Sequence, residues 1–119
     1  MILNVQIDDQ LLELNVPEAF IEQAEDFFAR MDADMDQGWQ MSRDWVDSPN
    51  AEQRCQIAAD KILTAIETEN EKLLMLMAAY ILRTMPGVTG INIDITGDMN
   101  ETDIIMGTEG SRPLGPIFT

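Results

Sequence analysis

The sequence predicts a single α+β domain, in which an antiparallel sheet of about four strands packs on two or three long helices. Three observations lead to this class. The 119 residues suit one domain. Apolar and polar residues alternate near both ends of the chain, which is typical of β-hairpins. The roughly seventy residues between these segments have helical spacing. Because an isolated hairpin is marginal in water, we expect both hairpins to share one sheet.

The first expected element is a β-hairpin over residues 1–16. Every second residue is apolar in residues 3–7 and again in residues 12–16. Asp8-Asp9-Gln10 separates the two runs, and aspartate is common in turns. The pattern therefore predicts two short antiparallel strands with one apolar face.

A long helix is expected from Pro17 to Asp47, because proline suits a first helical position. At 100° per residue, its apolar side chains fall within a sector of roughly 120°. Gly38 lies in this sector, where it either allows close approach of another helix or marks a kink. The sector consists of Phe20, Ile21, Ala24, Phe27, Phe28, Met31, Met35, Trp39, Trp45 and Val46.

Ser48-Pro49 is expected to end this helix and to begin the next, whose apolar stripe covers residues 55–66. Residues 68–71 have the spacing of a capping box, so this helix either breaks there or continues through an exposed turn. The run 73–82 is apolar on nearly every side and is expected to be the central core helix. Met85-Pro86-Gly87 ends it.

A second hairpin is expected near the C-terminus. Isoleucines alternate with polar residues over 91–95, residues 97–100 form the turn, and residues 102–106 return. The domain then covers residues 1–109, and the Gly- and Pro-containing residues 110–119 are expected to form a tail or an extended arm. The alternative is a helical bundle whose hairpins extend as arms into a homodimer.

Composition excludes several classes of function. The chain has no histidine, so histidine-based catalysis and histidine-containing metal sites are absent. Cys55 is the single cysteine, so no internal disulfide forms, and its place on an apolar stripe predicts an inert buried thiol. The net charge of −15 argues against direct binding to nucleic acid, because affinity for phosphates comes from Lys and Arg.

The start of the sequence has no basic region followed by an apolar run, and residues 73–82 are about half as long as a membrane span. We therefore expect a cytoplasmic protein with no membrane partner, which a single free cysteine also fits.

The segment Asp32-Ala-Asp34-Met-Asp36 resembles the start of a calcium loop but lacks the later glycine and glutamate that such a loop needs. On a helix, Asp34 points about 160° away from its two neighbours, so the three cannot bind one ion. We predict no metal site, no cofactor and no catalytic residue.

A row of acidic residues, here called the acidic ridge, runs along one side of the expected first helix. It consists of Glu18, Glu22, Glu25, Asp32, Asp36 and Asp47. It is either the solvated face of an amphipathic helix or a docking surface for a basic protein. Large aromatic residues at the edge of an apolar sector can anchor such a partner. The residues expected to contact a partner are Glu18, Glu22, Glu25, Asp32, Asp36, Asp47, Trp39 and Trp45.

The segments 27–45 and 54–60 resemble a family of small acidic bacterial proteins of unknown function. The resemblance covers about half of the chain. It implies no activity, cofactor or site residue, so it adds no functional expectation.

Three functions remain open. The first is a non-enzymatic interaction protein whose acidic first helix binds a basic protein surface. The second is an acidic nucleic-acid mimic or antitoxin-like inhibitor. The third is a small metal enzyme that depends on carboxylates.

Overall fold

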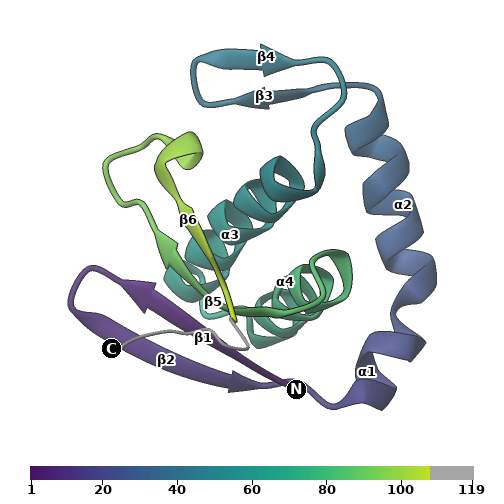
Figure 1. Cartoon of the computed structure of the whole chain (residues 1–119), viewed down its shortest axis with the longest axis vertical. Coiled ribbons are helices and arrows are strands. Elements are labelled where there is room, and N and C mark those ends of the chain that lie inside the picture. The colour runs from purple at the N-terminus through teal and green to yellow at the C-terminus, as the bar shows by residue number, and fades with distance from the viewer. Residues whose placement is uncertain (108–119) are drawn as a thin grey trace.

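The structure belongs to the predicted α+β class, with a four-stranded sheet on one side of a helical pair and a separate two-stranded hairpin at one end (Figure 1). It is a computed structural model and describes residues 1–107, so the predicted tail 110–119 lies outside the described residues. The elements are β1 (Ile2–Ile7), β2 (Gln10–Asn15), α1 (Glu18–Gln23), α2 (Glu25–Asp36), β3 (Trp39–Met41), β4 (Asp44–Val46), α3 (Ala51–Glu67), α4 (Glu71–Thr84), β5 (Val88–Ile93), the 3-10 turn η1 (Met99–Glu101) and β6 (Asp103–Met106).

The four strands of the main sheet lie in the order β2-β1-β5-β6, so the hairpins from both halves of the chain share one sheet, as predicted. The antiparallel arrangement is wrong at the centre, because β1 runs parallel to β5, with Asn4 beside Gly90. A parallel pair needs a long crossover, and the four helices supply it. Side chains alternate in the same way whichever direction a strand runs, so the sequence held no signal for this direction.

One face of the sheet packs on α3 and α4 and forms the core (Figure 1). Leu3, Val5 and Ile91 are fully buried on this face. On the far side of the helical pair, Phe28 of α2 meets Tyr80 of α4, with ring centroids 5.7 Å apart in an edge-on arrangement. These are the two largest fully buried side chains, so α2 completes the core.

The first hairpin follows the prediction. Asp8 and Asp9 form a two-residue turn between Ile7 and Gln10, which lie opposite each other. Asp8 has a φ of 55°, a left-handed conformation that aspartate tolerates better than most residues. The register continues without a shift to Ile2 opposite Asn15.

The single helix predicted from Pro17 to Asp47 is wrong. The chain bends at Ala24 between α1 and α2, and the helix ends at Asp36. Gly38 has a φ of 105°, which residues with side chains rarely adopt, and this turns the chain into the β3–β4 hairpin. Trp39 and Trp45 fit the helical sector by their spacing, but Trp39 lies opposite Val46 and Trp45 lies opposite Gln40 in the hairpin. Helical periodicity therefore gave the wrong secondary structure for this segment.

The helix that follows does break at residues 68–70. Asn50 caps α3, where its side chain accepts a hydrogen bond from the Gln53 amide and its own amide donates to the Gln53 side chain. Asn70 caps α4 by accepting from the Leu73 amide at 3.1 Å. The two caps explain why α3 and α4 form a helical hairpin instead of one long helix.

A tight reversal joins the two helices. The Asn70 amide donates to the Ala65 carbonyl at 2.8 Å, and the Glu69 amide donates to the Ile66 carbonyl at 3.2 Å. This is the Schellman arrangement, which usually places glycine where Glu69 has a φ of 56°.

The second hairpin is also confirmed, although its turn is longer than predicted. Ile91 and Ile93 are buried in β5, whereas Ile95 is 52% exposed outside the strand. Asp94 ends β5 because its carboxylate accepts hydrogen bonds from the amides of Thr96 and Asp98, both at 3.0 Å.

Candidate interaction surface

Asp32 joins three helices. Its Oδ1 accepts hydrogen bonds from Tyr80 OH at 2.6 Å and from Arg54 Nη1 at 3.2 Å. Its Oδ2 accepts from Arg83 Nη1 at 2.8 Å. Arg54 lies on α3, whereas Tyr80 and Arg83 lie on α4. A single carboxylate therefore ties α2 to the helical pair.

Two further acids extend this network to the surface. Arg54 Nη2 donates to Asp36 Oδ1, and Arg83 Nη2 donates to Glu25 Oε1, each at 2.5 Å. The side chains of Asp36 and Glu25 remain 64% and 53% exposed. Exposed ion pairs contribute on the order of 0–1 kcal/mol, so Asp32 supplies most of the electrostatic stabilisation.

The environment of Asp32 favours its charged form. Burial alone raises the pKa of this carboxyl group, but hydrogen bonds from Arg83, Tyr80 and Arg54 outweigh burial and bring the pKa below its usual value. Burial and the neighbouring Asp32 carboxylate both raise the pKa of Tyr80, so its hydroxyl group stays protonated and donates. The network is a stable structural contact at neutral pH.

The predicted acidic ridge is not one continuous line. Glu18 and Glu22 lie on α1, Glu25, Asp32 and Asp36 lie on α2, and Asp47 follows β4. All are exposed except Asp32, whose side chain is 28% exposed. The expectation of a fully solvated ridge is therefore wrong at Asp32, which stabilises the fold through its two arginines.

The two tryptophans lie on the β3–β4 hairpin and differ in environment. Trp39 is half-buried and packs against the core, with Lys61 Nζ 5.2 Å from the centroid of its ring. Trp45 is 58% exposed, the most exposed aromatic side chain among residues 1–107. Trp39 therefore attaches the hairpin to α3, while Trp45 presents a ring to solvent.

Trp45 is exposed but held in place. Its Nε1 donates a hydrogen bond to Asp47 Oδ1 at 2.9 Å. Its ring covers Gly38 so closely that a Cβ at that position would lie 2.3 Å from Cζ2. The hydrogen bond to Asp47 therefore fixes one edge of the indole, and the ring packs against the backbone of Gly38.

The surroundings of Trp45 are acidic. Gly38 follows the C-terminal turn of α2, so the ring lies at the end of that helix. The last turn of α2 holds Asp34 and Asp36 and no basic residue. A helix C-terminus carries partial negative charge, which disfavours acids in the last turn, and the ion pair with Arg54 compensates this for Asp36. We call Trp45 and Asp47, which are joined by the hydrogen bond from the indole, the tryptophan patch.

The tip of the hairpin is anchored to the loop between β5 and β6. Ser42 Oγ accepts a hydrogen bond from the Met99 amide at 2.9 Å and donates to the Gly97 carbonyl at 3.2 Å. Asn100 Nδ2 donates to the Met41 carbonyl at 3.2 Å. These bonds make the hairpin a fixed platform for the tryptophan patch.

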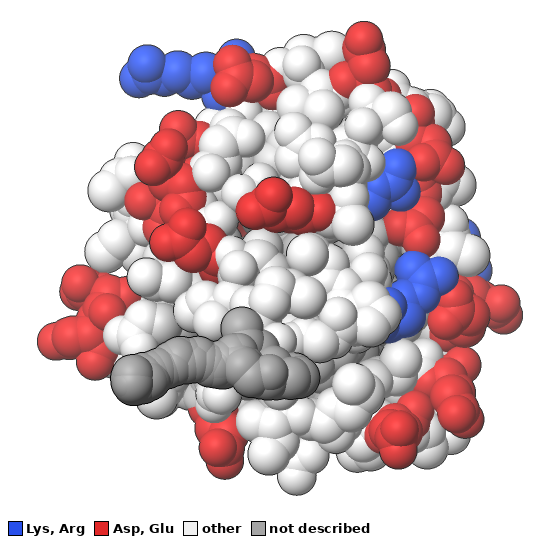
Figure 2. Space-filling model, in the orientation of Figure 1, with Lys and Arg blue, Asp and Glu red and all other residues white. Residues whose placement is uncertain are grey.

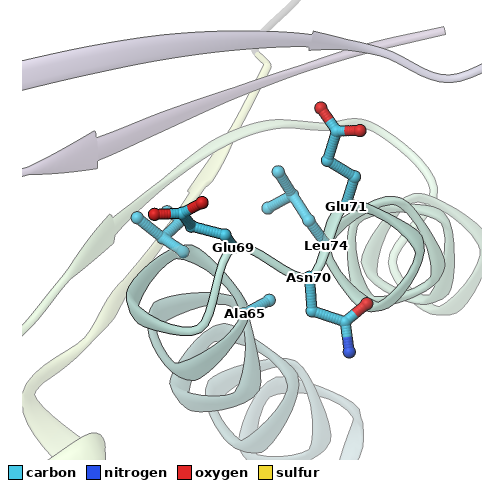
Figure 3. Close-up of a pocket in the computed structure, with 6 residues that line it drawn as sticks. Ala65, Glu69, Asn70, Glu71 and Leu74 are labelled. Carbon is cyan, nitrogen blue, oxygen red and sulfur yellow. The ribbon is translucent and has the colours of Figure 1, made fainter.

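A hollow of about 460 Å³ lies at the reversal between α3 and α4. Figure 3 shows the carboxylates of Glu69 and Glu71 on one side, with Leu74 between them, whereas Asn70 points the other way. Both glutamates are exposed and lack the burial that distinguishes catalytic carboxyl groups. Smaller hollows lie between the hairpin tip and the 94–98 loop, about 320 Å³, and between α1–α2 and α4, about 250 Å³.

Other sequence expectations can be compared with the structure. Cys55 is buried, and burial raises the pKa of its thiol to about 12, which suits an inert side chain. Asp34 points away from Asp32 and Asp36, which pair with arginine, and residues 1–107 hold no cluster of three or more side chains placed to bind a metal. No helix in this part of the chain is long and apolar enough to cross a membrane.

Sequence reasoning missed Arg54, Arg83 and Tyr80. A signal was present, because Arg54 precedes Cys55 at the start of an apolar stripe and Arg83 follows the apolar run 73–82. In a chain with seven Lys and Arg against 22 Asp and Glu, a base beside an apolar stripe indicates an internal ion pair.

Figure 2 shows acidic side chains along the side of the molecule formed by α2, with basic side chains among them, while the centre of this face is largely uncharged. No protein-family model, no curated protein and no solved structure matches this chain. The resemblance of segments 27–45 and 54–60 to small acidic bacterial proteins therefore stays a prediction.

Proposed function

We propose that the protein is a non-enzymatic binding module that holds a basic protein partner at the tryptophan patch. The observation that carries the proposal is Trp45, which is 58% exposed and yet held by Gly38 and Asp47. Tryptophan is enriched among the residues that dominate binding energy. Because the ring is already ordered, binding sacrifices little side-chain entropy.

The chemistry around the ring favours a cationic partner. A Lys or Arg side chain on the open part of the indole gains a cation–π contact. The Asp47 carboxylate, which is hydrogen-bonded to the indole, then lies beside the same cation. The net charge of −15, to which Glu18 and Glu22 contribute, steers a basic surface towards the protein before contact.

The nucleic-acid mimic is a special case of this proposal, in which the basic partner is itself a nucleic-acid-binding protein. The metal enzyme has no specific observation in its favour among residues 1–107. A cytoplasmic location fits the buried, unpaired thiol of Cys55.

Capture from cell extract by the immobilised protein tests the proposal. We expect basic proteins to bind at about 50 mM salt and to be released at about 300 mM, since screening shortens the reach of surface charges to below 10 Å. Trp45→Ala and Asp47→Asn should each reduce capture at least tenfold. Glu69→Gln is the matched control, because it removes the same charge beyond the far end of α3, roughly 25 Å away.

A Trp39→Phe variant makes Trp45 the single tryptophan, so titration with an arginine-rich peptide should change the tryptophan emission directly. Capture that is unaffected by Trp45→Ala, or that depends only on Glu18 and Glu22, would show that the tryptophan patch is not the binding surface.

A further inference from the structure

The outer side of β2 is an open sheet edge. In the described sheet β2 is an end strand and pairs only with β1. The two-residue turn makes Ile7 and Gln10 the closing hydrogen-bonded pair, so the backbone groups of Leu11, Glu13 and Asn15 point away from β1. Among residues 1–107, this six-residue strand therefore presents a row of backbone donors and acceptors that no other strand pairs with.

The β2 edge lacks the devices that usually protect an edge strand. Its sequence Gln-Leu-Leu-Glu-Leu-Asn has no proline, lysine or arginine, and its register with β1 contains no bulge. The opposite edge, β6, has only four residues and pairs with β5 through an irregularity between Val88 and Gly90. β3 and β4 have three residues each. Among the described strands, β2 alone is long, regular and unprotected.

Apolar side chains along β2 are incompletely covered. Leu11 is 65% exposed, the highest value among the large apolar residues of the described chain. Leu12 and Leu14 pack against the core and are still only half-buried. A neighbouring strand on this edge would cover all three.

The composition of β2 favours a second copy of the same strand as its partner. Three of its six residues are leucine and Glu13 is the one charged residue, so a second β2 strand offers matching apolar side chains. In an antiparallel pair, residues directly opposite each other point to the same face, so a symmetric pair of β2 strands is centred on one residue. Centring on Glu13 places two carboxylates directly opposite, which is unfavourable.

Centring on Leu12 removes this repulsion. Leu12 then faces Leu12 of the second copy on the core side, and Leu11 faces Glu13 of the second copy on the outer side. The free backbone groups of Leu11 and Glu13 become the hydrogen-bonded pairs on either side of the axis.

We propose that two copies of this protein form a homodimer by antiparallel pairing of their β2 strands about Leu12, which joins the two sheets into one of eight strands. A six-residue strand is roughly 20 Å long, so the contact lies near the low end of specific interfaces, and the dimer should dissociate in the micromolar range or above. Higher salt should lower the dissociation constant of the dimer, because screening reduces the repulsion between two acidic chains. This is opposite to the salt effect expected for a basic partner.

Disulfide trapping tests the register. Leu12→Cys places two thiols on the axis at a non-hydrogen-bonded pair, where Cα atoms are about 4.5 Å apart and a disulfide can form. Glu13→Cys is the matched control: it is more exposed, but in this register the two Cα atoms lie beyond the ~7 Å limit. Mild oxidation should cross-link Leu12→Cys, whereas Glu13→Cys and the wild-type chain, whose Cys55 is buried, should not cross-link.

Sedimentation equilibrium of the full chain supplies a second measurement that needs no new cysteine. Leu11→Glu should weaken dimerisation at least tenfold by facing Glu13 of the second copy, whereas Leu11→Lys should preserve or strengthen it. Thermal unfolding verifies that both variants fold.

Three results would overturn the proposal: a wild-type chain that stays monomeric near 1 mM in 0.5 M salt, cross-linking of Glu13→Cys as fast as Leu12→Cys, or a dimer unaffected by Leu11→Glu. A strand from another protein on this edge would give the first of these results. Trp45→Ala should leave dimerisation unchanged, which separates this test from that of the tryptophan patch.

Discussion

At the residue scale, the packing of α2 depends on one carboxylate. Replacing Asp32 by Asn should lower the free energy of unfolding by about 1–3 kcal/mol at pH 7, because Arg54 and Arg83 would stay partly buried without their shared charge. Urea unfolding measures this difference. Asp34→Asn, exposed on the same helix, is the control and should change stability by less than about 0.5 kcal/mol.

The loss of stability caused by Asp32→Asn should depend on pH. The folded pKa of Asp32 lies below its ordinary value of 3.8, so the unfolded chain takes up the proton first as the pH falls. The stabilisation is therefore present above about pH 4 and is lost progressively below it. The difference between wild type and Asp32→Asn should shrink in that range, and a constant difference down to pH 3 would assign it to packing instead of charge.

Glu69 gives a prediction of the opposite sign. Its left-handed conformation, with a φ of 56°, costs a residue with a side chain roughly 1 kcal/mol relative to glycine. No hydrogen bond or ion pair of the Glu69 carboxylate is found among the described residues. Glu69→Gly should therefore raise the free energy of unfolding by about 0.5–1 kcal/mol, measured by urea unfolding, whereas Glu69→Ala should not.

At the element scale, the β3–β4 hairpin depends on the contact between Trp45 and Gly38. Gly38→Ala should destabilise the protein by about 1–3 kcal/mol, because a Cβ would meet the ring and because φ is 105°. In a Trp45→Ala background the steric part disappears and only the backbone strain, about 1 kcal/mol, should remain. Equal losses in both backgrounds would mean that the ring does not pack on Gly38.

The elements also show where sequence reasoning works. Strict alternation at residues 3–7 predicted a strand correctly, and alternation at residues 91–95 did so as far as Ile93, where β5 ends. The capping signal at residues 68–71 marked a real break. The β3–β4 hairpin was missed because its tryptophans continue the helical sector, and strands of three residues are too short to show an alternating pattern. The partners of Asp32 were missed for another reason: Arg54 and Arg83 lie 22 and 51 residues away, and local pattern contains no information about such contacts.

At the scale of the whole molecule, net charge opposes the compact state. The charge of −15 is concentrated on a small protein, and self-repulsion destabilises the fold. Raising NaCl from about 10 mM to about 0.3 M should therefore raise the melting temperature by several degrees, since roughly 1 kcal/mol corresponds to about 4 °C at this size. The Leu11→Glu variant separates this effect from dimerisation. A melting temperature that falls with salt would mean that ion pairs outweigh repulsion.

The parallel contact between β1 and β5 has a consequence for the order of folding during synthesis. Asn4 and Thr89 are hydrogen-bonded across 85 residues. β1 is synthesised first, but it cannot pair with β5 until nearly the whole described chain has been synthesised. Such non-local closure is slow because the entropy of a long loop is lost before contacts compensate. Until β5 has left the ribosome, the N-terminal hairpin has two open edges, and the nascent chain is most prone to association in that interval.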